Sequence, residues 1–139
     1  MKYIAVVECV SSGILYVDEI ISRGFKPLIV NVYMSEFTEG LIHYREMVAQ
    51  RYADRVEYID EDPDFEAFAA KLKEYDIAAV FPGSEYGVRL ADRMNGVLDL
   101  RGNDDRTTHY RCNKAGIRRI EIDADDHDDS RACDYQPER

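Results

Sequence analysis

Short apolar runs alternate with amphipathic stretches through most of this chain. Apolar runs over residues 3–7, 27–32 and 76–81 predict strands, and the first, which is rich in branched side chains, suits a strand that is buried on both faces. Residues 55–59 predict a further short strand. Between these runs, apolar side chains recur at intervals of three and four residues, which is typical of helices. We therefore expect helices over residues 14–23, 41–53 and 86–95, and another one that ends near Leu72.

Two of these helices carry signals at their ends. Gly24 follows the helix over residues 14–23 and can adopt the left-handed conformation that often ends a helix. Asp62 can accept hydrogen bonds from the first amides of the helix that ends near Leu72, and Pro63 fits the first position of that helix. Asp64 and Glu66 would then lie where the helix dipole favours acids. This helix is expected to begin at Pro63.

The alternation of strands and helices predicts the α/β class. The expected architecture is a three-layer, Rossmann-like open parallel sheet of four to five strands with helices on both faces. Residues 97–100 would supply the fifth strand. If the strand order is 3-2-1-4, ligands bind between the first and fourth strands, beyond their carboxyl ends. The loops over residues 8–13 and 82–86 would then meet at this site.

The first of these loops contains Ser11, Ser12 and Gly13 ahead of a helix. Small hydroxyl residues and a glycine allow backbone amides to face an anion, and the helix dipole favours that anion. The alternative is that Ser11 or Ser12 simply caps the helix. Neither the three-glycine dinucleotide motif nor the phosphate-binding loop with its Gly-Lys-Ser/Thr ending is present.

The second loop contains Gly83, Ser84 and Glu85. A carboxylate here would receive an ammonium group or a hydroxyl donor from a ligand. The alternatives are that Ser84 is a helix cap and that Glu85 only favours the helix dipole. A later turn over residues 101–104 precedes a short expected helix, which Asp104 or Asp105 could cap.

Composition limits the partners of this domain. The net charge is −10 and the pI is about 4.7, which argues against general binding of nucleic acid or of anionic membranes. No apolar run approaches the roughly 18 residues of a membrane span, and the first residues do not form a signal peptide.

Three distant cysteines predict neither a disulfide framework nor a zinc site, so we expect a reducing cytoplasm. Cys9 is interpreted as a small core residue rather than a nucleophile.

The charge divides the chain into a folded body over residues 1–116 and an acidic tail over residues 117–139. The tail has two interpretations. Residues 119–123 alternate in the manner of an edge strand, or the tail is foreign to the fold, that is, non-native or disordered. Its acidic run over residues 125–129 lacks the pattern of an EF-hand loop, and no metal site is predicted in the chain.

Several motifs, taken in order, resemble the N-terminal (pre-ATP-grasp) domain of the ATP-grasp carboxylate–amine ligases. The first is Ser11-Ser12-Gly13 after the first strand. The second is the sequence PGSEYGV over residues 82–88, which continues into LADR over residues 90–93. A Gly-Asn turn at Asn103 and the pair Asn113-Lys114 follow. The resemblance covers about residues 1–115, and the order and spacing of the motifs carry it.

The resemblance implies an enzyme that uses ATP and Mg²⁺ to form an acyl phosphate, which an amine then attacks. Residues Ser11, Ser12 and Gly13 would face a carboxylate or phosphate of a small, amino-acid-like substrate. Other polar groups of that substrate would contact Gly83, Ser84, Glu85 and Asn103. Lys114 resembles a lysine that reaches the ATP phosphates in several members. No catalytic residue is assigned.

The same resemblance ends at Lys114, where the family continues into two further domains that bind ATP and metal. We therefore expect the substrate-side domain of a ligase that is not catalytic alone and binds neither ATP nor Mg²⁺ tightly, so its status as an enzyme stays open. Its partners would be the missing ligase domains or a second copy in a homodimer. The alternatives are a free-standing metabolite-binding module and a self-associating interaction domain.

Overall fold

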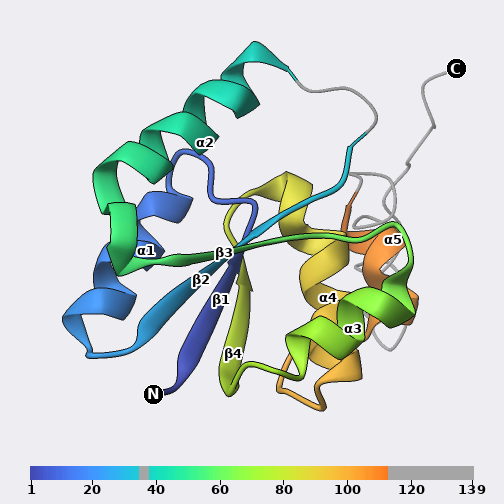
Figure 1. The fold of residues 1–139 in the computed structure, drawn as a ribbon. Coiled ribbons are helices and arrows are strands. Elements are labelled where there is room, and N and C mark those ends of the chain that lie inside the picture. The colour runs from blue at the N-terminus through green and yellow to red at the C-terminus, as the bar shows by residue number, and fades with distance from the viewer. Residues whose placement is uncertain (35–37, 113–139) are drawn as a thin grey trace, which may run out of the picture. The chain divides into compact units, whose positions relative to one another are not determined.

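Four parallel strands form one sheet in the described part of the chain, in the order β3-β2-β1-β4 (Figure 1). The strands are β1 (Tyr3–Val7), β2 (Lys26–Asn31), β3 (Glu57–Asp60) and β4 (Ile77–Pro82). This computed structural model describes residues 1–34 and 38–112. The chain divides into two units, Met1–Thr108 and His109–Arg139, and the sheet belongs to the first. The assumed strand order is confirmed.

Helices cover both faces of the sheet, so the predicted three-layer α/β architecture is confirmed (Figure 1). On one face lie α1 (Gly13–Ser22) and α2 (Glu39–Tyr52), and on the other lie α3 (Phe65–Leu72) and α4 (Val88–Val97). Three 3₁₀ turns, η1 (Ala53–Arg55), η2 (Glu85–Gly87) and η3 (Asp105–Thr107), and the short helix α5 (Thr108–Arg111) complete the described elements.

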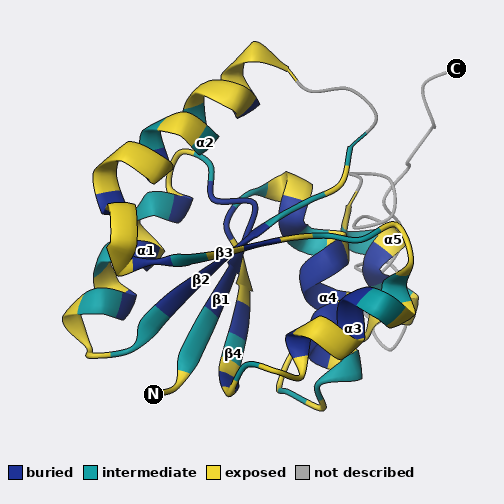
Figure 2. Cartoon of the chain, in the orientation of Figure 1, coloured by how far each residue is buried: buried dark blue, intermediate teal, exposed yellow. Residues whose placement is uncertain are grey.

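Successive side chains of β1 point to opposite faces of the sheet, and each face carries one half of the core. Ala5 and Val7 pack with α3 and α4, whereas Val6 packs with α1 and α2. All three side chains are fully buried. Figure 2 shows β1 changing from intermediate to buried along its length. A strand that is covered on both faces needs apolar side chains at every position, which is why the short run over residues 3–7 was informative.

The end of α1 has the geometry that Gly24 predicted. Gly24 has a φ of 79°, and its N–H donates to the carbonyl of Ile21 at 3.0 Å. The N–H of Phe25 donates to the carbonyl of Ile20 at 3.1 Å. These two bonds form a Schellman motif, which satisfies carbonyls that the helix leaves without partners.

The predicted start of α3 at Pro63 is wrong by two residues. The carboxylate of Asp62 accepts the N–H of Asp64 at 2.9 Å, which closes a turn around Pro63 instead of a helical turn. Asp64 is the N-cap, and its Oδ1 accepts the N–H groups of Glu66 and Ala67. The helix therefore begins at Phe65.

The fifth strand over residues 97–100 is not formed. Helix α4 continues through Val97, and Asp99 then adopts a φ of 52°. The N–H of Leu100 donates to the carbonyl of Asn95 at 2.9 Å, which folds the segment back on the helix. Leu98 and Leu100 still pack against the core, so their apolar character reflects burial in a loop.

Candidate functional site

The loops after β1 and β4 meet backbone to backbone at the carboxyl edge of the sheet. A Cβ atom on Gly13 would lie only 2.4 Å from the carbonyl oxygen of Gly83. One on Gly83 would lie 2.8 Å from the carbonyl oxygen of Glu8. The N–H of Gly83 donates to the carbonyl of Val7 at 2.7 Å. We call this contact the glycine junction (Gly13 and Gly83), and it confirms that the two loops adjoin as the strand order predicts.

A third glycine, Gly87, allows η2 to lie close to the backbone of β1. A Cβ atom on Gly87 would lie 2.1 Å from the carbonyl oxygen of Val7, which is backbone and cannot turn aside. Glycine at this position therefore allows α4 to start directly above the end of β1.

Ser11 and Ser12 both have exposed side chains in the first loop. Ser11 adopts a φ of 53°, and Ser12 is the N-cap of α1 but makes no side-chain cap hydrogen bond. The N–H groups of Gly13, Ile14 and Leu15 donate instead to carbonyls of residues 10, 11 and 12, at 3.0 to 3.2 Å. Ser12 therefore occupies the cap position, as the alternative interpretation had it, but without the side-chain hydrogen bond of a cap. Within the part of the chain that the structure describes, the hydroxyl and amide groups of Ser11 and Ser12 remain as donors at the loop.

Ser84 and Glu85 follow the glycine junction in the second loop. Ser84 is the N-cap of η2 without a side-chain cap hydrogen bond, and its Oγ is buried with no partner among the described residues. Glu85 is exposed in the first turn of η2. Ser84 therefore occupies the cap position that the alternative interpretation gave it, but its hydroxyl does not make the hydrogen bond of a cap. A buried hydroxyl without a partner is costly, and a ligand atom could satisfy it.

A buried ion pair, which the sequence analysis missed, supports the first loop. Glu8 is fully buried at a φ of 55°, and its two carboxylate oxygens accept from the Arg45 guanidinium at 2.9 and 2.7 Å. One of them also accepts the N–H of Val32 at 2.8 Å. These bonds tie the end of β1 to β2 and α2. The only signal in the sequence was an acid at the end of an apolar strand.

An exposed aromatic pair flanks the two loops. The rings of Tyr16 and Phe81 stack at 5.9 Å between centroids with an interplanar angle of 10°. Tyr16 lies in the first turns of α1, and Phe81 immediately precedes Pro82 at the end of β4. Both side chains are nearly half exposed. The sequence analysis did not predict this pair, because the two residues lie far apart in the chain and no local pattern connects them.

A further predicted residue, Asn103, does not join the loops. Asn103 is exposed in the turn after α4, and a Cβ atom on the adjacent Gly102 would lie 2.6 Å from the Asn95 side chain. This turn therefore packs on the far half of α4. Asp104 caps η3, since its carboxylate accepts the N–H of Arg106 at 3.0 Å. Lys114 lies outside the described residues.

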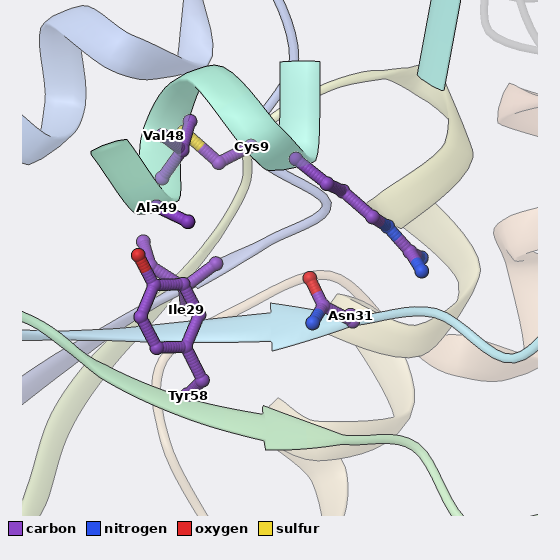
Figure 3. A pocket seen from close by; sticks show the side chains of 7 residues that line it. Cys9, Ile29, Asn31, Val48, Ala49 and Tyr58 are labelled. Atoms are coloured by element: carbon purple, nitrogen blue, oxygen red, sulfur yellow. The ribbon is translucent and has the colours of Figure 1, made fainter. Parts of the chain in front are cut away.

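A small cavity of about 170 Å³ lies between α2 and the sheet (Figure 3). Cys9 and Val48 line one side of it and Ile29 and Tyr58 the other. Burial, together with the charges of Glu8 and Asp18, raises the pKa of the Cys9 thiol to about 12. A thiol that stays protonated at neutral pH is a poor nucleophile. The interpretation of Cys9 as a core residue is confirmed.

Within residues 1–34 and 38–112, no group of three or more His, Cys, Asp and Glu side chains is placed to hold a metal ion. Over the same residues, no helix has the length and apolar character needed to span a membrane.

Comparison with known proteins shows a similarity to a solved structure. No protein-family model and no curated protein matches the chain. Among solved structures, the chain is similar to an L-amino acid ligase from Bacillus licheniformis, with a TM-score of 0.56 and 18% sequence identity. The match covers 88% of this chain and 30% of that ligase. At this identity the likeness establishes a shared fold, over less than a third of the ligase.

Proposed function

We propose that this chain forms the substrate-side part of an ATP-dependent ligase that joins a carboxylate to an amine, and that this part does not catalyse the reaction alone. The observation that carries the proposal is the glycine junction, because it places Ser11, Ser12, Ser84 and Glu85 in two adjoining loops. The similarity in fold to part of an L-amino acid ligase supports the choice of reaction.

Each loop offers a different kind of hydrogen-bonding group. The hydroxyls and amides of Ser11 and Ser12 are donors at the start of a ten-residue helix, which suits a substrate carboxylate. Glu85 is an exposed carboxylate, which suits an ammonium group or a hydroxyl. The loops therefore bind and orient a small, amino-acid-like substrate.

In such ligases ATP supplies the phosphoryl group that activates the carboxylate. The described residues do not provide a metal-binding set for the Mg²⁺ that accompanies ATP. Lys114, the residue proposed to reach the ATP phosphates, lies outside the described residues. The role proposed for this chain is therefore limited to binding and orienting the substrate.

Calorimetry on the full chain tests the proposal, with N-acetyl-L-alanine as the carboxylate probe and L-alaninamide as the amine probe. We expect binding of L-alaninamide to weaken about tenfold or more in Glu85→Gln, because a charge-assisted hydrogen bond is lost. Glu66→Gln is the matched control, since Glu66 is also an exposed acid in the first turn of a helix. Ser12→Ala should weaken binding of N-acetyl-L-alanine.

Two results would contradict the proposal. Binding of both probes that is unchanged in Glu85→Gln and Ser12→Ala would exclude the loops as the substrate site. Hydrolysis of ATP with Mg²⁺ by the chain alone, lost in these variants, would show that it is catalytically complete.

A second candidate function is self-association, which the exposed aromatic pair Tyr16 and Phe81 favours. Leu15 beside them is also exposed, and β4 lies at one edge of the four-stranded sheet that the described residues form. Exposed apolar side chains next to an unpaired strand edge are a common basis of protein contacts.

A further inference from the structure

A second cavity, of about 440 Å³, lies on the α4 side of the carboxyl edge of the sheet. It opens beyond the ends of β2 and β3 and along the first two turns of α4, and none of the loop residues Ser11, Ser12, Gly83, Ser84 and Glu85 lines it. Its volume falls within the range of about 300–1,000 Å³ that is usual for ligand sites. Its walls carry Tyr33, Glu61, Tyr86, Arg89, Arg93 and Asp105.

Two arginines form one wall of this cavity. Arg89 and Arg93 are four residues apart on α4, so they lie on the same side of the helix. The Arg93 guanidinium lies 3.7 Å from the centroid of the Phe65 ring, which holds it in place while leaving its N–H edge available. Neither arginine has a carboxylate within 4.0 Å among the residues that the structure describes.

Two carboxylates belong to the same cavity. Oε2 of Glu61 accepts the N–H of Tyr33 at 2.8 Å, which fixes the side chain at the end of β3. Oε1 of Glu61 has no donor in residues 1–34 and 38–112. Asp105, at the start of η3, likewise forms no ion pair with a described residue. The cavity therefore holds two positive and two negative groups that do not neutralise one another directly.

We infer that this cavity binds a zwitterion, namely a free α-amino acid. Its carboxylate would bind to Arg89 and Arg93, and its ammonium group to Glu61 and Asp105. The exposed rings of Tyr33 and Tyr86 would contact its side chain. A ligand with only a negative charge would be repelled by the two carboxylates, and a ligand with only a positive charge would be repelled by the two guanidinium groups. A ligand that carries both charges can pair with all four groups. The residues Ser11, Ser12, Gly83, Ser84 and Glu85 of the proposed ligase site take no part in this binding.

The test is a titration of the full chain with L-phenylalanine, followed by NMR of ring-labelled tyrosine. Tyr33→Phe and Tyr86→Phe assign the two signals. We expect saturable shifts of both signals. N-acetyl-L-phenylalanine, which lacks the ammonium group, and L-phenylalaninamide, which lacks the carboxylate, should each bind about tenfold more weakly or worse. An analogue that binds as tightly as L-phenylalanine would overturn the inference.

Variants show which groups bind the ligand. The double variant Arg89→Ala/Arg93→Ala should weaken binding of L-phenylalanine by tenfold or more, and Glu61→Gln should weaken it while still accepting the Tyr33 N–H. Arg101→Ala is the matched control, because Arg101 is exposed and does not line the cavity. An unchanged thermal midpoint shows that each variant is folded.

The outcome is distinguishable from failure of the proposed ligase role. Shifts that persist in Arg89→Ala/Arg93→Ala but vanish in Glu85→Gln would place the amino acid at the loops, which overturns this inference and leaves the proposed function standing. If L-phenylalanine shifts the Tyr33 signal in the wild type but not in Arg89→Ala/Arg93→Ala, the result supports binding in the cavity, whatever is found for Glu85→Gln.

Discussion

Glu8 is a carboxylate with no exposed surface, and Arg45 is the cation that neutralises it. Arg45→Ala would leave this charge buried without its partner, so we expect the free energy of unfolding to fall by about 3–5 kcal/mol. Arg51→Ala is the control, because Arg51 pairs with Asp18 at 2.9 Å on the surface and should cost about 0–1 kcal/mol. Urea denaturation measures both losses. Equal losses would contradict the role given to the buried pair.

The thiol of Cys9 is expected to be inert in the folded protein, since its pKa is raised to about 12 and its side chain is almost fully buried. The measurement is alkylation by iodoacetamide at pH 8 in a chain that keeps only this cysteine, with Cys112→Ser and Cys133→Ser. Labelling should be slow in buffer and fast in urea. Fast labelling in buffer, at an unchanged thermal midpoint, would contradict the burial of this thiol.

The same thiol makes stability depend on pH in the alkaline range. Its ordinary pKa is 9.0 and its folded pKa is about 12, so the unfolded chain loses this proton first as the pH rises. The stabilisation is therefore fully present below about pH 9 and is lost progressively as the pH rises toward 12. Urea denaturation at pH 8 and pH 10.5 should show this loss, and Cys9→Ala should make it smaller.

At the scale of single residues, the sequence predicted environments better than partners. An apolar run is enough to place Cys9 in the core. The partner of Glu8, however, lies 37 positions further along the chain, and no local pattern connects the two. The same reason explains why the stacking of Tyr16 on Phe81 was not predicted.

At the scale of elements, Gly87 and Gly96 lie at opposite ends of α4 and should respond oppositely to alanine. A Cβ atom on Gly87 would lie 2.1 Å from a backbone oxygen of β1, whereas one on Gly96 meets nothing within 4 Å. Gly87→Ala should therefore destabilise the protein by roughly 1–3 kcal/mol. Gly96→Ala should stabilise it by about 0.5–1 kcal/mol, since alanine favours a helix. Thermal and urea unfolding measure both changes in stability. Changes of the same sign in the two variants would contradict the contacts described for these glycines.

Element boundaries were less predictable than the elements themselves. Asp62, Pro63 and Asp64 form a sequence in which either acid can cap a helix, and the choice depends on which one closes a turn first. Leu98 and Leu100 are apolar because they pack on the core, and packing alone does not distinguish a strand from a loop. Periodicity therefore predicts that an element exists more reliably than where it ends.

At the scale of the whole molecule, the order of strands and helices was enough to predict the sheet and the edge where the loops meet. Right-handed crossovers leave few arrangements for such a pattern, and one of the commonest is the one observed. The cavity that carries Arg89 and Glu61 was not predicted, because its walls come from four separate segments.

The exposed aromatic pair Tyr16 and Phe81 should make the protein associate at high concentration. Phe81 is 43% exposed on the edge strand β4, and Tyr58 is 40% exposed on the opposite edge strand β3. If the aromatic pair drives association, Phe81→Lys should lower the mass that light scattering reports, and Tyr58→Lys should not. An equal effect of the two variants would assign association to strand edges in general.

The glycine junction also affects how the two loops can move. Because Gly13 meets the carbonyl of Gly83 without an intervening side chain, neither loop can shift toward the other by changing a rotamer. Displacement of one loop has to be transmitted to the other, so the two should respond to a ligand as one rigid body. A spectroscopic label placed on either loop would then report occupancy of both.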